Sequence, residues 1–133
     1  MFIPFRVSAF VVLLAQGLGC LAWWALLWIS PAFRATFAFG EVPARVFDGL
    51  FLADAALYAG LALFGAWLMW RGSDYGFTAL IVHFGVAAYA TLMAFGLGGA
   101  SGHGTLGGIV MAIPTALEGG LVVLLAREDA RVR

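Results

Sequence analysis

Residues 109–125, IVMAIPTALEGGLVVLL, decide the fold, because they are apolar enough to lie in lipid. A helix crosses the ~30 Å hydrocarbon core of a bilayer with about 20 residues, since each residue adds about 1.5 Å. The stretch nevertheless contains a proline, Pro114, and a carboxylate, Glu118. We therefore predict a membrane-spanning helix over residues 106–126 that carries one ionisable side chain inside the membrane.

Three further apolar runs have the length of membrane spans. They are too long for strands, and their hydrophobic residues do not alternate. The connection over residues 31–45 carries Phe33 and Phe37 at helical spacing, which predicts a short interfacial helix between the first two spans. The sequence thus predicts an all-α integral membrane protein, with four transmembrane helices in an up-down-up-down antiparallel bundle that forms one domain over residues 1–133. The expected spans are residues 6–30, 46–70, 75–97 and 106–126.

The composition supports lipid as the solvent of this chain. It is 64% hydrophobic and 11% charged, with a mean hydropathy of +1.03, whereas soluble chains contain about 25% charged residues. The formal net charge is zero, so there is no electrostatic basis for nucleic-acid binding. The single cysteine, Cys20, excludes an intrachain disulfide and any CxxC redox or zinc motif.

The arginines predict the orientation in the membrane. With four spans, the N-terminus, the loop at residue 71 and the C-terminus lie on one side, which then holds five of the seven arginines. Because cytoplasmic loops are enriched in basic residues, we predict that both termini are cytoplasmic, in a bacterial cytoplasmic membrane. Trp23, Trp24 and Trp28 are expected at the opposite interface. The five arginines are Arg6, Arg71, Arg127, Arg131 and Arg133, against Arg34 and Arg45 on the other side.

Counting residues from the helix ends predicts a polar pocket inside the bundle. His83 and Glu118 each lie about eight residues, or ~12 Å, from the cytoplasmic face, and Gln16 lies ~15 Å from it. Ionisable groups at such depth normally face the bundle interior or a cavity. We therefore expect Glu118 and His83 to be in contact, with Gln16 nearby. Asp54, with Tyr58 one turn deeper, is expected to form a second polar group nearer the outer leaflet.

Two interpretations of these five residues remain open. Carboxylate and imidazole ladders bind ligands or relay protons in transporters. Alternatively, His83 and Glu118 only lock the bundle, since interhelical hydrogen bonds average ~0.6 kcal/mol in one membrane protein. No metal site, cofactor or catalytic residue is predicted. His103 lies in a glycine-rich loop over residues 98–108, at a different height from His83, so the two histidines do not suit one metal or haem.

Pro114 predicts a kink in the last span, because it leaves the carbonyl of Val110 without its intrahelical donor. Gly119 and Gly120 follow, and they would let another backbone approach. The three residues are candidates for a hinge, and a static kink is the alternative. Stripes of small residues predict helix contacts within the bundle. These stripes are Ala15, Gly19 and Ala22; Gly49, Ala53, Ala56 and Gly60; and Ala87, Ala90 and Ala94.

Three functions fit this sequence. The first is a membrane protein that binds or carries a small or amphipathic solute, with proton linkage, as a homo-oligomer in membrane lipid. The second is a non-catalytic accessory subunit, in contact with other subunits of a larger membrane complex of respiratory or photosynthetic type. The third is a lipid- or quinone-processing enzyme that uses Glu118 and His83 as acid and base. It ranks last, because the sequence contains no strong catalytic signature.

Overall fold

The computed structural model describes residues 3–37, 43–101 and 105–132, and these residues are helical almost throughout. No strand occurs in these ranges. A seven-residue π-helical segment, η1, interrupts the second span between two α-helices. The elements are α1 (Ile3–Ile29), α2 (Pro31–Phe37), α3 (Ala44–Ala53), η1 (Asp54–Gly60), α4 (Leu61–Arg71), α5 (Tyr75–Ser101) and α6 (Thr105–Val132).

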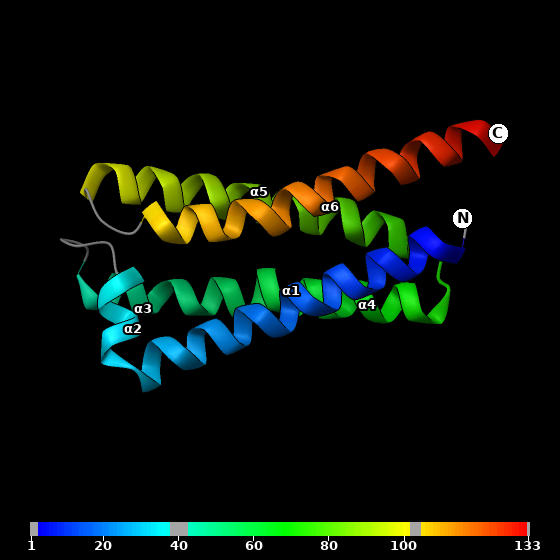
Figure 1. Cartoon of the computed structure of the whole chain (residues 1–133). Helices are drawn as coiled ribbons and strands as arrows, with labels where there is room; N and C mark the ends of the chain where they lie inside the picture. The colour runs from blue at the N-terminus through cyan, green and yellow to red at the C-terminus, as the bar shows by residue number, and fades with distance from the viewer. Residues whose placement is uncertain (1–2, 38–42, 102–104, 133) are drawn as a thin grey trace.

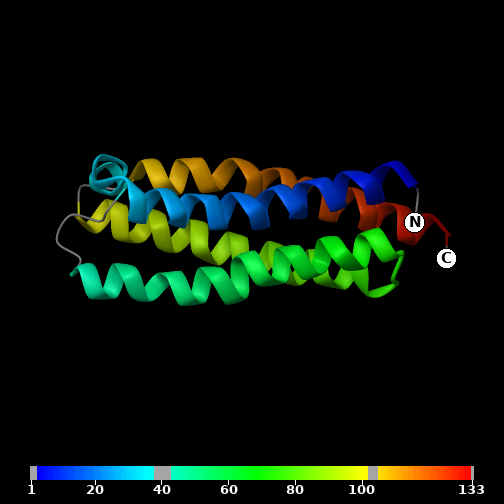
Figure 2. The same ribbon diagram turned by 90° about the horizontal axis from the view of Figure 1, so that it is seen from below.

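The elements form four long antiparallel helices, which confirms the predicted fold class. The spans are α1, the composite helix α3–η1–α4, α5 and α6, and each is long and apolar enough to cross a membrane. In Figure 1, α5 and α6 lie above α1 and the composite helix, and both ends of the chain lie at the same end of the bundle. Figure 2 shows the same arrangement from below.

The outer surface of the bundle suits lipid rather than water. Large apolar side chains, among them Ile29 and Leu52, are more than 70% exposed. In water, a surface of this kind would drive aggregation. In a bilayer it is the face that contacts acyl chains, so the chain is an integral membrane protein.

The predicted end of the third span, in the glycine-rich stretch, is wrong. Gly98 and Gly99 do not end this span, because α5 continues to Ser101. The fourth span begins at Thr105, next to the predicted start at residue 106, and continues through Gly107 and Gly108. Glycine disfavours helix in water by about 1 kcal/mol. Lipid offers the backbone no other hydrogen-bond partners, so helix persists through glycines that would end it in water. His103 lies outside the described residues.

The composite helix ends where Arg6 of α1 meets it. Arg6 Nε donates to the carbonyl oxygen of Met69 at 2.6 Å, and Nη2 donates to that of Trp70 at 3.3 Å. Gly72 follows with φ 76°, a left-handed conformation that glycine adopts without strain. The Met69 carbonyl also accepts from the backbone N–H of Gly72, so Arg6 adds a side-chain donor at this helix end, and it ties the first span to the second.

Of the three predicted stripes of small residues, one lies at a helix contact and two do not. Ala87, Ala90 and Ala94 are buried as expected. By contrast, the stripes of α1 and of the composite helix are exposed, so as contacts within this bundle they are wrong. The close approach of α1 to the second span occurs instead at Gly17, where a Cβ would lie 2.7 Å from Leu63 Cγ. Stripes of small residues identify faces for close packing, but they do not say which neighbour uses each face.

Gly17→Ala is expected to destabilise the bundle by about 1–3 kcal/mol, because the new methyl group overpacks the contact with Leu63. Gly19→Ala is the matched control, since nothing lies within 4 Å of a Cβ there. The control should be neutral, or stabilising by up to about 1 kcal/mol. Unfolding by SDS in mixed micelles, followed by circular dichroism, measures both. Equal effects would show that the close approach is not at Gly17.

Candidate functional site

A buried pair of ionisable residues joins α5 to α6. His83 Nδ1 lies 2.8 Å from Glu118 Oε1 and 3.0 Å from Oε2, and both side chains are 0% exposed. The predicted contact between them is therefore confirmed. Depth counting succeeded here because the two residues come from neighbouring antiparallel helices with a common end.

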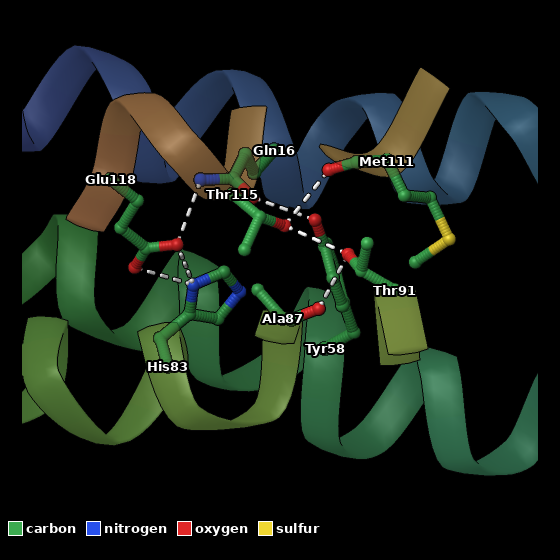
Figure 3. Close-up of polar contacts among 8 residues, drawn as sticks. All are labelled: Gln16, Tyr58, His83, Ala87, Thr91, Met111, Thr115 and Glu118. Atoms are coloured by element: carbon green, nitrogen blue, oxygen red, sulfur yellow. Dashed lines mark hydrogen bonds and ion pairs between the residues drawn. The ribbon is translucent and has the colours of Figure 1, made fainter. Parts of the chain in front are cut away.

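Two further side chains extend the pair into a network across all four spans (Figure 3). Gln16 Nε2 of α1 donates to Glu118 Oε2 at 3.0 Å, and the Tyr58 hydroxyl of η1 donates to Gln16 Oε1 at 2.6 Å. The Tyr58 ring also packs edge-on against the His83 imidazole, at 4.9 Å between ring centroids. Tyr58 was expected in an outer group with Asp54, and that grouping is wrong: Tyr58 belongs to the inner network with Gln16, His83 and Glu118.

Asp54 lies apart from this network and has a partner that the sequence did not suggest. Trp24 Nε1 donates to Asp54 Oδ2 at 2.9 Å. Trp24 is 3% exposed, so it packs inside the bundle and not against lipid, and its expected depth near the membrane interface stays a prediction. Cys20 Sγ lies 3.8 Å from the backbone carbonyl oxygen of Asp54. Asp54 and Trp24 therefore form a second polar contact between the first two spans.

The π-helical segment η1 begins at Asp54 and contains Tyr58. Such segments widen one helical turn and occur frequently at functional sites. A regular α-helix was expected here, and no residue type in DAALYAG indicates otherwise. The widening changes the rotation of every residue that follows relative to those before it. Depth along the membrane was therefore predictable for Tyr58, but its direction was not.

Two threonines beside the network were not predicted. Thr91 Oγ1 of α5 and Thr115 Oγ1 of α6 lie 3.0 Å apart. Each hydroxyl also lies 2.8 Å from a carbonyl oxygen of its own helix, that of Ala87 and that of Met111 respectively (Figure 3). Two hydroxyl protons serve only two of these three contacts at a time. A signal was present in the sequence, because Thr91 follows His83 by eight residues and so shares its helix face.

A partly open cavity of about 350 Å³ adjoins the network between α1, η1 and α6. Its wall includes Gln16 and Tyr58, which link it through hydrogen bonds to Glu118. Exposed residues of α1 and α6, such as Ala15 and Leu117, border it, so the opening faces lipid. The lining residues are Val12, Ala15, Gln16, Gly19, Cys20, Trp23, Trp24, Asp54, Tyr58, Val110, Met111, Pro114 and Leu117.

Aromatic residues pack at Trp23, at the end of the cavity nearest α2. Trp23 lines the cavity, and its ring lies 5.1 Å from the ring of Phe33 and 4.3 Å from that of Phe37, between centroids. The short helix α2 between the first two spans therefore packs on α1 through the two phenylalanines that predicted it. These rings hold Trp23 in place beside the cavity.

The three residues expected to form a hinge have different surroundings. Pro114 lies inside α6, which remains helical on both sides of it, and it lines the cavity. At Gly119 a Cβ would lie 2.9 Å from the Phe84 ring, whereas nothing lies within 4 Å at Gly120. The expected approach of another backbone is therefore wrong, because an aromatic side chain fills the space at Gly119. Hinge motion at Pro114 stays a prediction.

The His83–Glu118 pair can hold one proton in two ways. A neutral carboxyl with a neutral imidazole, and a carboxylate with an imidazolium, both have zero net charge. Loss of that proton would leave one negative charge inside the bundle, where an uncompensated charge is costly. His83 Nε2 is buried and has no hydrogen-bond partner among the described residues. The pair can therefore share one proton without placing a net charge inside the bundle.

No group of three or more potential metal ligands occurs in the described ranges. The chain matches no protein-family model, and neither a curated protein nor a solved structure is significantly similar to it. The function must therefore be inferred from the network and the cavity themselves.

Proposed function

We propose that this membrane protein binds a small or amphipathic solute in the cavity between α1, η1 and α6. The observation that carries this proposal is the position of the cavity. It opens towards lipid, and its wall includes two members of a buried hydrogen-bond network. A volume of about 350 Å³ falls within the range of small-molecule sites, roughly 300–1,000 Å³.

The chemistry of the wall supports an amphipathic solute. Most of the lining side chains are apolar or aromatic, and the polar ones are Gln16, Asp54 and Tyr58 with the thiol of Cys20. A few convergent polar groups in an apolar pocket orient a ligand without demanding that it be water-soluble. Such a molecule would partition into the bilayer and enter sideways between α1 and α6.

The hydrogen bonds that join the cavity wall to the His83–Glu118 pair support a link between the solute and protons. Tyr58 donates to Gln16, and Gln16 donates to Glu118. A solute that forms a hydrogen bond with Tyr58 or Gln16 would disturb the bond that Gln16 donates to Glu118. Binding would thereby rearrange the hydrogen bonds of the His83–Glu118 pair, and this rearrangement is the proposed link between the solute and the proton. Carriage of the solute, driven by a proton gradient, is the fuller form of this proposal.

We also propose an orientation in the membrane. Arg6 at the start of α1, Arg71 at the end of α4 and Arg127 in the last turns of α6 lie at one end of the bundle. By the positive-inside rule, these arginines support a cytoplasmic location of that end in a bacterial cell.

A second candidate function is that of an accessory subunit of a larger membrane complex, and a separate observation supports it. Gly49, Ala53, Ala56 and Gly60 of the composite helix are all exposed, and small exposed residues suit close packing of another helix from a second copy or a different chain. Purification in mild detergent separates the two, because only a subunit would retain stoichiometric partner chains. The enzyme hypothesis has no observation of this kind and stays a prediction from sequence.

Filling the cavity is expected to abolish solute retention. Ala15→Phe places a ring at its lipid-facing border, and Ala22→Phe adds the same ring to another exposed position of α1 that does not line it. Mass spectrometry of small molecules extracted from protein purified with native lipid should find a compound in the wild type and in Ala22→Phe. Its amount should fall at least about tenfold in Ala15→Phe, the equivalent of ~1.4 kcal/mol.

The opposite result is an identical small-molecule extract from all three proteins. It would mean that only bulk lipid is recovered, and the cavity would then have no solute to bind. A partner chain in place of a compound would favour the accessory subunit.

A further inference from the structure

We infer that the cavity selects a lipophilic cation, an apolar or aromatic body with an ammonium-type charge, and that Asp54 pairs with that charge. This inference rests on the proposed function, because it names the class of solute for the same cavity. Asp54 lies inside the second span and lines the cavity, and its carboxylate bonds to Trp24 and not to the Glu118 network.

The charge balance of the cavity favours a positive ligand. Among the described residues that line the cavity, Asp54 is the one with a charged side chain. In the described part of the chain, only the bond from Trp24 reaches its carboxylate, at Oδ2. Arg34, from the same end of the bundle, donates to Asp48 at 2.7 Å. Among the described residues, no cation is a partner of the Asp54 carboxylate, and a carboxylate inside a membrane requires one or must be neutral.

The aromatic residues around Asp54 point to the same ligand class. Trp23 and Trp24 both line the cavity. Indole rings are the best aromatic partners of cations, and the attraction is largest where water is excluded. Phe33 and Phe37 pack on Trp23, which fixes its ring beside the cavity. A carboxylate with two tryptophans beside it is suited to an alkylammonium group, whereas an anion would meet a like charge and negative ring faces.

The apolar remainder of the cavity suits the body of such a molecule. From Asp54 the wall continues past Cys20 to Val110, Met111 and Leu117 of α6. A compound with a charged head and an apolar body would place its head at Asp54 and its body along α6.

The test compares two probes of equal shape. Benzyltrimethylammonium carries the charge, and neopentylbenzene replaces its nitrogen by carbon. Binding of each to the protein in phosphatidylcholine nanodiscs is measured by equilibrium dialysis against empty nanodiscs. We expect the cation to bind the wild type at least about tenfold more tightly than the neutral isostere. Asp54→Asn should remove this preference and leave the affinity for neopentylbenzene unchanged.

The variants are matched so that a structural effect is recognisable. Asparagine retains an oxygen that accepts from Trp24, so Asp54→Asn preserves that contact. Asp48→Asn removes another carboxylate from the same composite helix, one that is exposed and lies outside the cavity, and it should keep the wild-type preference. Equal affinity of the wild type for both probes, or an unchanged preference in Asp54→Asn, would overturn the inference. In either case saturable binding of neopentylbenzene leaves the proposed function standing, whereas no saturable binding of either probe overturns both.

Discussion

Replacement of His83 by leucine is expected to destabilise the bundle by about 3–5 kcal/mol, the typical cost of leaving one member of a buried ion pair without its partner. His83 is the only residue of α5 that contacts the Glu118 carboxylate among the described hydrogen bonds, and both side chains are fully buried. In the variant, Glu118 would keep one donor, Gln16, inside an apolar bundle. Unfolding by SDS in mixed micelles measures the loss.

The size of this effect separates the two interpretations of the pair. An ordinary interhelical hydrogen bond in a membrane contributes ~0.6 kcal/mol. A loss near that value would mean that His83 and Glu118 only lock the helices together as neutral groups. A loss several times larger would favour a pair that holds charge, because removal of one partner leaves an uncompensated buried charge at a cost of about 3–5 kcal/mol.

The double variant His83→Leu with Glu118→Leu provides the control. It removes the carboxylate as well, so the buried charge disappears, although Gln16 then loses its acceptor. We expect the double variant to be more stable than His83→Leu alone, with a coupling of about 1–3 kcal/mol between the two sites. The single variant Glu118→Leu completes the comparison. If the stability losses of His83→Leu and Glu118→Leu add up to that of the double variant, the residues are not coupled and their contact does not contribute to stability.

Depth was the part of this site that the sequence predicted well. It depends only on where each helix begins and on a fixed rise per residue, and both follow from the lengths of apolar runs. His83, Glu118 and Gln16 were therefore placed at one height without any knowledge of the packing. Their mutual hydrogen bonds then followed, because polar groups in lipid turn towards one another.

Rotation about the helix axes was the part that could not be predicted. Tyr58 turns towards Gln16, and Asp54 towards Trp24, on a helix whose π-helical turn has no sequence signal. Gly17 makes the close contact of α1, although Gly19 belonged to the stripe that looked more regular. The cavity could not be predicted for a related reason, since an unfilled volume depends on the directions of side chains from three elements at once.

Glu118→Gln is expected to abolish the link between solute and protons while leaving the fold intact. The amide has the shape of the carboxyl and still offers an oxygen acceptor and a donor to His83 and Gln16, but it neither binds nor releases a proton. The matched control is Glu128→Gln, a carboxyl of the same helix that is absent from the cavity wall.

The measurement uses liposomes with an imposed pH gradient and the compound recovered from the wild-type protein. Accumulation driven by the gradient should fall at least about tenfold in Glu118→Gln and remain in Glu128→Gln. Unfolding by SDS should differ little between the two variants, because neither leaves a charge unpaired in the bundle. A Glu118→Gln protein that accumulates the compound as the wild type does would reduce the network to a structural lock beside the cavity. Loss of accumulation with retained binding would instead place the proton at Glu118 and His83 and the solute in the cavity, joined by Gln16 and Tyr58.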